Sequence, residues 1–140
     1  MSRVLTFWID GRPVPKQRTR TVRSPYGKAH TFTPPRTKRW EHTIRVHAMR
    51  AVAQSQWRPT AASYEVDVDV HRARRQGDAD NFLKSALDAL NGVTWPDDRM
   101  VRRAEVKLID GDGEGMRIRI TRVEVPPVGP ISDINLTGAE

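Results

Sequence analysis

Cysteine is absent from the 140 residues of this chain. Its absence excludes a disulfide framework and a zinc site held by thiolates. A chain of this length can instead form one domain around a hydrophobic core without disulfides or a structural metal. The lack of cysteine also fits a reducing compartment, and we expect a cytoplasmic protein.

Long apolar runs are absent as well. No stretch approaches the roughly 20 apolar residues needed to span a bilayer, and the first ten residues are too short and too polar for a signal peptide. The chain also lacks a long basic helix with the apolar face that binds membrane surfaces. We therefore expect a soluble protein with no membrane partner.

Acidic residues are scarce in one block of the sequence. Between Gly11 and Arg50 there are 11 Lys and Arg residues and one acid, Glu41, whereas the net charge of the whole chain is +7. The remainder of the chain therefore carries a net negative charge. Lys and Arg beside phosphates release condensed counterions, so this block favours a polyanionic partner over a merely solvated basic surface.

Apolar periodicity predicts a single α+β domain with a mixed sheet of about four strands and two main helices. The predicted elements, in chain order, are strand 4–9, helix 37–54, strand 64–70, helix 81–90, and strands 101–109 and 116–125. The domain is expected to cover residues 1–125. Residues 126–140 are rich in Pro and Gly and are expected to form a flexible tail.

Two connections have distinctive compositions. Residues 12–35 contain several prolines, which exclude a regular helix and predict a long basic loop that orders on a ligand, with room for a short hairpin around residues 25–27. Residues 110–115 alternate acids with glycines and predict a hairpin turn that joins the last two strands.

The most informative stretch runs from Gly77 to Asp98. Asp78, Asp80 and Lys84 surround the predicted start of the second helix, with Asp80 as its N-cap and Gly92 as the residue after its end. A second acidic pair, residues 97–98, follows the helix. This acidic cluster stands out in a basic chain.

The chemistry of the cluster depends on whether its carboxylates converge. If Asp78, Asp80 and Asp98 meet, they repel one another and require a cation, and oxygen ligands without Cys or His favour Mg²⁺ or Mn²⁺. A metal-activated water could then attack a phosphodiester, with Lys84 adding a fixed positive charge. Convergence requires that the connection after the helix runs back along it, which the sequence does not establish.

Each residue of the cluster also has a structural interpretation. An Asp-x-Asp-Asn segment before a helix is commonly a turn with an N-cap, and residues 97–98 could form a turn after Pro96. Lys84 alone would be a solvated surface lysine, and Asp88 a surface partner of Arg or Lys. Trp95 is expected to fill the core and anchor the turn before residue 97.

Taken together, these residues resemble the RusA family of Holliday-junction endodeoxyribonucleases. The similarity lies in the order Asp-x-Asp-Asn-x-x-Lys-x-x-x-Asp-Ala-Leu within residues 77–92, followed by Trp-Pro-Asp-Asp at residues 95–98. Segments of the basic block are also similar, namely residues 7–11, 13–20, 31–34 and 37–41. The resemblance covers most of residues 7–120.

The resemblance implies a homodimeric, Mg²⁺-dependent enzyme, with Mn²⁺ as a substitute, that resolves four-way DNA junctions by paired phosphodiester cleavage in recombination and repair. It implies a bacterial cytoplasm, with the gene carried by the cell, a phage or a prophage. The implied catalytic residues are Asp78, Asp80, Asp98 and Lys84. The three aspartates are also the implied metal ligands, with Asp97 as an alternative to Asp98.

The expected DNA-binding residues come from three segments. Residues 16–20 match a DNA-binding loop of the family, residues 72–76 form a basic connection, and Asn81 belongs to the acidic motif. The residues expected to contact DNA are Lys16, Arg18, Arg20, Arg72, Arg74, Arg75 and Asn81.

Two other functions remain open at this point. A non-catalytic DNA- or RNA-binding module would explain the basic block and leave the acids as a structural turn. A Mg²⁺-dependent glycosyl or nucleotidyl transferase could use Asp-x-Asp, but the chain has no glycine-rich nucleotide loop.

Overall fold

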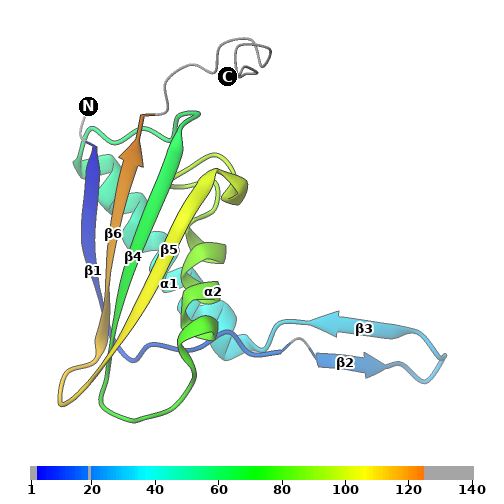
Figure 1. Cartoon of the computed structure of the whole chain (residues 1–140). Helices are drawn as coiled ribbons and strands as arrows, with labels where there is room; N and C mark the ends of the chain where they lie inside the picture. Colours follow the sequence, from blue (N-terminus) through cyan, green and yellow to red (C-terminus); the bar gives the residue numbers. More distant parts are fainter. Residues whose placement is uncertain (1–2, 19, 125–140) are drawn as a thin grey trace, which may run out of the picture.

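In a computed structural model, the chain is described over residues 3–18 and 20–124. The elements, in chain order (Figure 1), are β1 (Val4–Asp10), β2 (Arg20–Arg23), β3 (Ala29–Phe32), α1 (Pro35–Gln54), β4 (Ser63–Arg72), α2 (Ala79–Leu90), the 3₁₀ turn η1 (Asp98–Met100), β5 (Val101–Asp110) and β6 (Gly115–Val123). The tail predicted at residues 126–140 lies outside the described residues.

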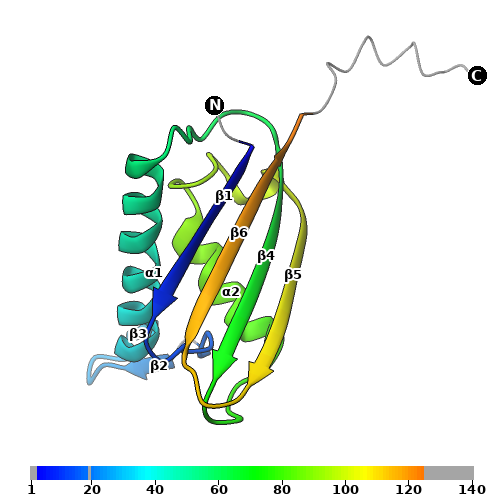
Figure 2. The ribbon, with the colours of Figure 1, turned by 90° about the vertical axis from the view of Figure 1, so that its left-hand side faces the viewer.

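The main sheet has four strands in the order β1-β6-β4-β5. Strands β4 and β5 are parallel, and the other neighbouring pairs are antiparallel. Both helices lie on one face of this sheet, α1 beside β1 and α2 beside β5 (Figures 1 and 2). The prediction of an α+β domain with a mixed four-stranded sheet and two helices is therefore confirmed.

Alternation along β4 sets which face of the sheet is buried. Tyr64, Val66, Val68 and Val70 point toward the helices and are almost fully buried, as their spacing predicts. They pack with apolar residues from both helices, among them Ile44 of α1. Burial of each side chain of this size contributes about 1.5–3 kcal/mol to the stability of the fold. The row therefore accounts for a large part of the core's contribution.

The predicted hairpin at residues 110–115 is wrong. Strands β5 and β6 are not neighbours, because β4 lies between them and pairs with both. Since α2 crosses over the sheet between β4 and β5, these strands are parallel, as in a β-α-β unit. The glycine-rich connection instead passes the end of β4, where Gly111 N–H donates to Arg72 O at 2.9 Å.

The second helix begins earlier than predicted. Asp78, and not Asp80, is its N-cap: the Asp78 side chain accepts a hydrogen bond from Asn81 N–H at 3.1 Å. Asp80 therefore lies inside the first turn. At the other end, Gly92 follows the C-cap Asn91 with φ +80°, as predicted.

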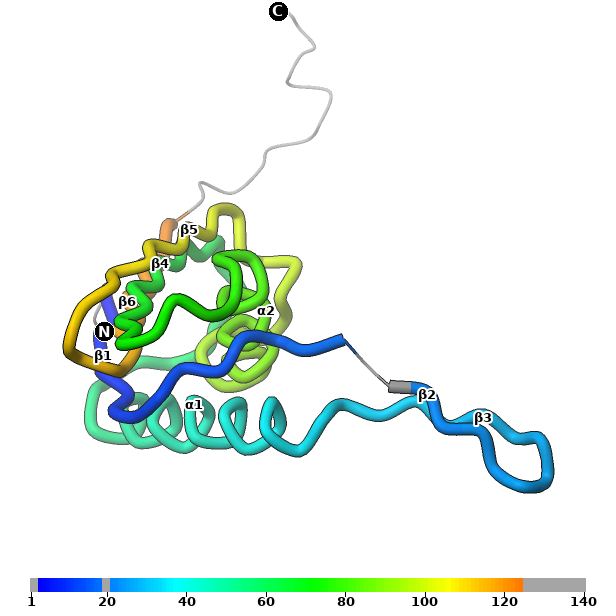
Figure 3. The backbone as a smooth tube through the Cα atoms, turned by 90° about the horizontal axis from the view of Figure 1, so that it is seen from below, coloured from blue at the N-terminus to red at the C-terminus, as the bar shows by residue number. Residues whose placement is uncertain are grey.

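The basic loop predicted at residues 12–35 contains a β-hairpin. Strands β2 and β3 pair with each other and not with the main sheet, and the hairpin projects from the body as an arm, defined here as residues 20–32 (Figures 1 and 3). Its turn lies at residues 24–28, where Gly27 N–H donates to Ser24 O at 2.9 Å. Tyr26 at the tip is 92% exposed.

Candidate nucleic-acid interface and acidic site

Two of the predicted catalytic carboxylates lie together at the start of α2. Asp78 uses one oxygen to cap the helix, and Asp80 lies two residues later in the first turn. Both are exposed. The positive end of the helix dipole stabilises negative charge at this position. The two carboxylates therefore face solvent at a site whose geometry is set by the helix cap.

The loop before Asp78 is held by Arg72, the last residue of the inward-facing row of β4. The Arg72 guanidinium donates to the carbonyls of Gln76 and Gly77, at 3.2 and 2.8 Å, and to both carboxylate oxygens of Asp110. The Arg72 hydrogen bonds, opposed by desolvation and supported by Arg75, hold the pKa of Asp110 below its usual value. Arg72 is thus bound within the protein, which leaves it little capacity for DNA.

Gly77 completes the approach to the helix. Its φ is +85°, and a Cβ at this position would lie 2.7 Å from Pro15 Cγ and 2.9 Å from a ring carbon of Phe82. Both the backbone conformation and the space therefore require glycine. This close packing fixes the position from which Asp78 begins the helix.

Asp98 lies at the opposite end of α2. It is the first residue of η1, and one of its carboxylate oxygens accepts a hydrogen bond of 2.7 Å from Trp95 Nε1. Desolvation raises the pKa of Asp98 above its usual value; the Trp95 hydrogen bond opposes this, and the charges of Asp88 and Asp97 add to it. Trp95 is fully buried, so it is both a core residue, as predicted, and the group that orients Asp98.

A single chain does not bring the three aspartates together. Helix α2 has 12 residues, about 18 Å at 1.5 Å per residue, and it separates Asp98 from Asp78 and Asp80. Within residues 3–18 and 20–124, no group of three or more His, Cys, Asp or Glu is close enough to hold a metal ion. The carboxylate oxygens suit Mg²⁺ chemically, but one chain supplies only a pair of them at each end.

Lys84 and Asp97 flank these positions. Lys84 is exposed, one turn after Asp80 on α2. Asp97 caps η1 by accepting from Arg99 N–H at 3.0 Å, and its other oxygen lies 3.7 Å from Arg99 Nε. Asp97 is therefore occupied with its own turn, whereas Asp98 is held by a side chain from the core.

Lys16 joins the two helices. Its ammonium lies 2.7 Å from Glu41 of α1 and 3.0 Å from Asp88 of α2. Desolvation lowers the pKa of Lys16, but the hydrogen bonds and charges of these two carboxylates outweigh it and leave the pKa raised. Asp88 is thus the surface partner of a lysine, as predicted, and Lys16 has two protein carboxylates as neighbours.

The other expected DNA-binding residues differ in availability. Arg18 and Arg74 are exposed. Arg75 is exposed but lies 3.3 Å from Asp110. Asn81 is half-buried, and its backbone carbonyl accepts from Lys16 N–H at 2.8 Å. Arg20 belongs to β2, and its side chain lies outside the described part of the structure.

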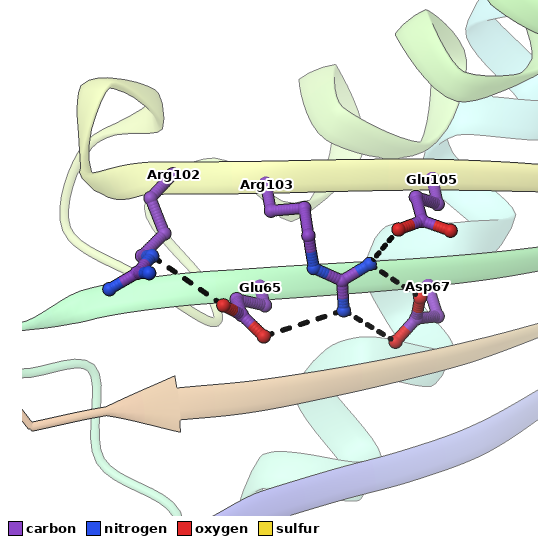
Figure 4. Close-up of polar contacts among 5 residues, drawn as sticks. All are labelled: Glu65, Asp67, Arg102, Arg103 and Glu105. Atoms are coloured by element: carbon purple, nitrogen blue, oxygen red, sulfur yellow. Dashed lines mark hydrogen bonds and ion pairs between the residues drawn. The ribbon is translucent and has the colours of Figure 1, made fainter.

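The face of the sheet opposite the helices carries charges of both signs, some of them paired. Figure 4 shows Arg102 and Arg103 of β5 directed at Glu65 and Asp67 of β4, with separations of 3.3–3.5 Å. Arg103 also contacts Glu105. These pairs engage Arg102 and Arg103, whereas Lys107, Arg117 and Arg119 on the same face form no ion pair with any residue of the described ranges.

Uncompensated cations gather at the end of the molecule where β4 ends and α2 begins, from which the arm also projects (Figure 1). They come from the arm and the segment before it, the first turns of α1, the loop before α2 and α2 itself. Those that form no ion pair with any residue of the described ranges are Arg18, Arg23, Lys28, Arg36, Lys38, Arg39, Arg74 and Lys84. The open carboxylates of Asp78 and Asp80 belong to this same end.

Two features of this region could not be predicted from the sequence. Arg36 lies beside the loop that carries Arg74, in a shared cavity, but nothing in the local pattern relates two residues so far apart in the chain. The Trp95–Asp98 hydrogen bond is only weakly indicated by the sequence. The two residues are three positions apart, and the indole N–H of Trp95 is a hydrogen-bond donor that a nearby carboxylate can accept from.

Comparison with known proteins gives one match. The family model described as endodeoxyribonuclease RusA matches residues 10–121, which include the arm, both ends of α2 and Asp98. No curated protein matches the chain. No helix in the described residues is long and apolar enough to cross a membrane.

Proposed function

Because the chain belongs to the endodeoxyribonuclease RusA family, we propose that it cuts four-way DNA junctions on two strands, as a homodimer that depends on Mg²⁺. The observation that carries the proposal is the pairing of two exposed carboxylates, Asp78 and Asp80, with a set of uncompensated cations at one end of the fold. The cations bind phosphates of the junction arms. The carboxylates mark the place of cleavage.

For all three aspartates to hold one metal ion, Asp98 has to come from a second chain. We propose that Asp78 and Asp80 of one subunit and Asp98 of the partner subunit together hold Mg²⁺, which when bound would activate water and stabilise charge at the phosphate. The chain's own residues prepare the site. The helix cap positions Asp78, the Trp95 indole positions Asp98, and Lys84 places a positive charge near the scissile phosphate.

The arrangement of α2 and β5 suits such a dimer. Strand β5 is an edge of the four-stranded sheet, and α2 packs beside it. A two-fold axis on this side, perpendicular to α2, would set the two α2 helices antiparallel, so that the C-terminal end of one lies by the N-terminal end of the other. Symmetry then gives two identical composite sites, which matches a substrate that has approximate two-fold symmetry and is cut on two strands.

The decisive experiment uses a labelled four-way junction with Mg²⁺ or EDTA and a linear duplex as competitor. We expect symmetric cuts that need the metal and spare the duplex. Asp80→Asn should lower the cleavage rate at least about a hundredfold, or about 2.7 kcal/mol, while binding persists, because the substitution removes a charge that repels phosphates.

Asp112→Asn is the matched control, since Asp112 is an exposed acid in the glycine-rich connection. We expect it to cleave at the wild-type rate. Equal cleavage by wild type and Asp80→Asn would refute the catalytic assignment. Tight junction binding without any metal-dependent cleavage by wild type would instead favour a non-catalytic DNA-binding module.

The arm supplies a second prediction, on the salt dependence of junction binding. Arg23 and Lys28 are exposed and have no ion-pair partner among the described residues. If each neutralises one phosphate, Arg23→Ala/Lys28→Ala should reduce the slope of log K against log[salt] by about 1.8, at about 0.9 per contact. Arg102→Ala, at an arginine that is already paired with Glu65, should leave the slope unchanged; an unaltered slope in the arm variant would exclude the arm from DNA binding.

A further inference from the structure

A cavity of about 150 Å³ lies beside the acidic end of α2. Its floor and walls include Phe82, which is 1% exposed, together with Pro13 and Val14 from the segment after β1. The loop before α2 contributes Arg74 and Gln76, and the first turn of α1 contributes Arg36. Segments distant in the sequence thus enclose one partly apolar space.

The size of this space is that of one aromatic ring. Apolar cavities of about 150 Å³ in proteins accept a benzene molecule. The cavity is too small for a peptide helix or an oligosaccharide, and it is lined on one side by rings and aliphatic carbons that suit a flat ligand. Seven of the eleven lining residues are charged or polar and four are apolar, so the space suits a ring that also carries polar groups.

The charges at the cavity specify what kind of ring would enter. Arg36 and Arg74 form no ion pair within the described ranges, whereas Arg12 is paired with Glu114 at 3.2 Å. Two free guanidinium groups favour a ligand with phosphates attached, and they can also stack on a base. The Gln76 side chain forms no hydrogen bond with another described residue, and it offers both a donor and an acceptor for a base edge.

The cavity also has a fixed position relative to the acidic site. Gln76 is two residues before Asp78, and Gly77 between them packs directly on Phe82 and Pro15. A base held in the cavity would therefore place its own strand next to Asp78 and Asp80. Bases near a branch point are the easiest to unstack, because the cost of removal from the stack is lowest where pairing is already disturbed.

The geometry points to a binding site for one unstacked nucleobase, next to the phosphate to be cut. This inference rests on the proposed function and extends it: Gln76 contacts the edge of the base, Phe82 forms the floor, and Arg36 and Arg74 hold the flanking phosphates. The base bound in this site determines which phosphodiester reaches the carboxylates. The cavity therefore selects the position of the cut.

The test uses four-way junctions that each carry a single abasic nucleotide at a different position near the branch. Affinities are measured in EDTA by gel mobility shift. Wild-type protein should bind one abasic position and its two-fold equivalent about tenfold more weakly than the intact junction, since base contacts of this kind are lost. In Gln76→Ala the gap between the intact and abasic junctions should narrow, because the contact of Gln76 with the edge of the base is lost.

The matched control is Arg75→Ala, because Arg75 is adjacent to Arg74 but does not line the cavity. It should weaken binding of every junction by one common factor and preserve the tenfold gap. The inference is overturned if no abasic position weakens binding by wild type, or if Gln76→Ala keeps the gap. Addition of Mg²⁺ to the same samples separates the two proposals: cleavage of the intact junction without any abasic effect defeats only the cavity, whereas no cleavage at all defeats the proposed function as well.

Discussion

A mixture of two inactive variants should recover cleavage. Asp80→Asn and Asp98→Asn are each expected to be inactive as homodimers. In a heterodimer with composite sites, one site takes Asp78 and Asp80 from the Asp98→Asn subunit and Asp98 from the Asp80→Asn subunit, so all its carboxylates are intact. We expect its cleavage rate to exceed that of either homodimer at least about a hundredfold, and only one strand of each junction should be nicked.

The physical reason is the length of α2. Its 12 residues, about 18 Å, keep Asp98 of one chain away from Asp78 and Asp80 of the same chain. A Mg²⁺ ion binds its oxygen ligands at about 2.0–2.1 Å, so aspartates at opposite ends of a helix cannot share one ion. Heterodimers carrying two different affinity tags, purified in two steps, would provide the sample.

The reciprocal mixture is the control. A subunit with both substitutions, Asp80→Asn/Asp98→Asn, paired with a wild-type subunit places one lesion in each composite site. That heterodimer should be inactive, although it contains a complete wild-type chain. If each site belonged to one chain, this heterodimer would nick one strand and the first mixture would stay inactive, which would contradict the composite site.

Asp98→Asn should fold normally, which makes it a sound partner in these mixtures. The asparagine oxygen can still accept the Trp95 Nε1–H hydrogen bond. Because the pKa of Asp98 is raised in the folded state, mainly by desolvation, ionisation of Asp98 at neutral pH opposes folding. Removal of the charge should therefore leave thermal stability equal to that of wild type or slightly higher.

The second large effect is expected at Arg72. Arg72→Met keeps the apolar stem near Phe82 but removes the guanidinium that binds Gln76 O, Gly77 O and Asp110. We expect a loss of about 3 kcal/mol in the free energy of unfolding, because buried groups are left without partners, and a fall in Tm of roughly 10 °C. Cleavage should fall about a hundredfold even where the variant is folded, since the loop that presents Asp78 is released.

Arg75→Ala is the matched control for stability. Both arginines contact Asp110, but the Arg75 side chain is 86% exposed and that of Arg72 is 10% exposed. An exposed pair contributes little, so Arg75→Ala should change stability by less than about 0.5 kcal/mol. The free energy of unfolding of both variants can be measured by urea unfolding. Equal losses of this free energy would show that the burial of Arg72 does not determine how much it stabilises the fold.

The pH dependence of stability gives a further readout of the Arg72 contact. The pKa of Asp110 is lowered in the folded state, chiefly by hydrogen bonds from Arg72. Its ionised form therefore stabilises the fold above the unfolded-state pKa, and this contribution is lost as the pH falls through the lower, folded-state pKa. The difference in stability between wild type and Arg72→Met should be widest near neutral pH and should narrow in acid.

Local patterns in the sequence determine much of this protein. The alternation from Tyr64 to Val70 predicts a buried strand row, and the apolar spacing within α1 and α2 predicts both helices. The turn at residues 25–27 and the role of Gly92 follow from backbone preferences of single residues. These features depend on neighbours within a few positions, where period and conformational preference act directly.

Only the tertiary structure decides the strand order, the position of Asp98 and which arginines are free. The Asp- and Gly-rich residues 110–115 resemble a hairpin turn, but β4 separates the strands they join, because packing across the whole sheet outweighs a local turn preference. Arg72 and Arg74 are two residues apart with the same side chain, yet one is buried in a hydrogen-bond network and the other is exposed. Charge is a property of the residue, but its availability to DNA depends on partners from distant segments, and those partners are brought together only by the packed chain.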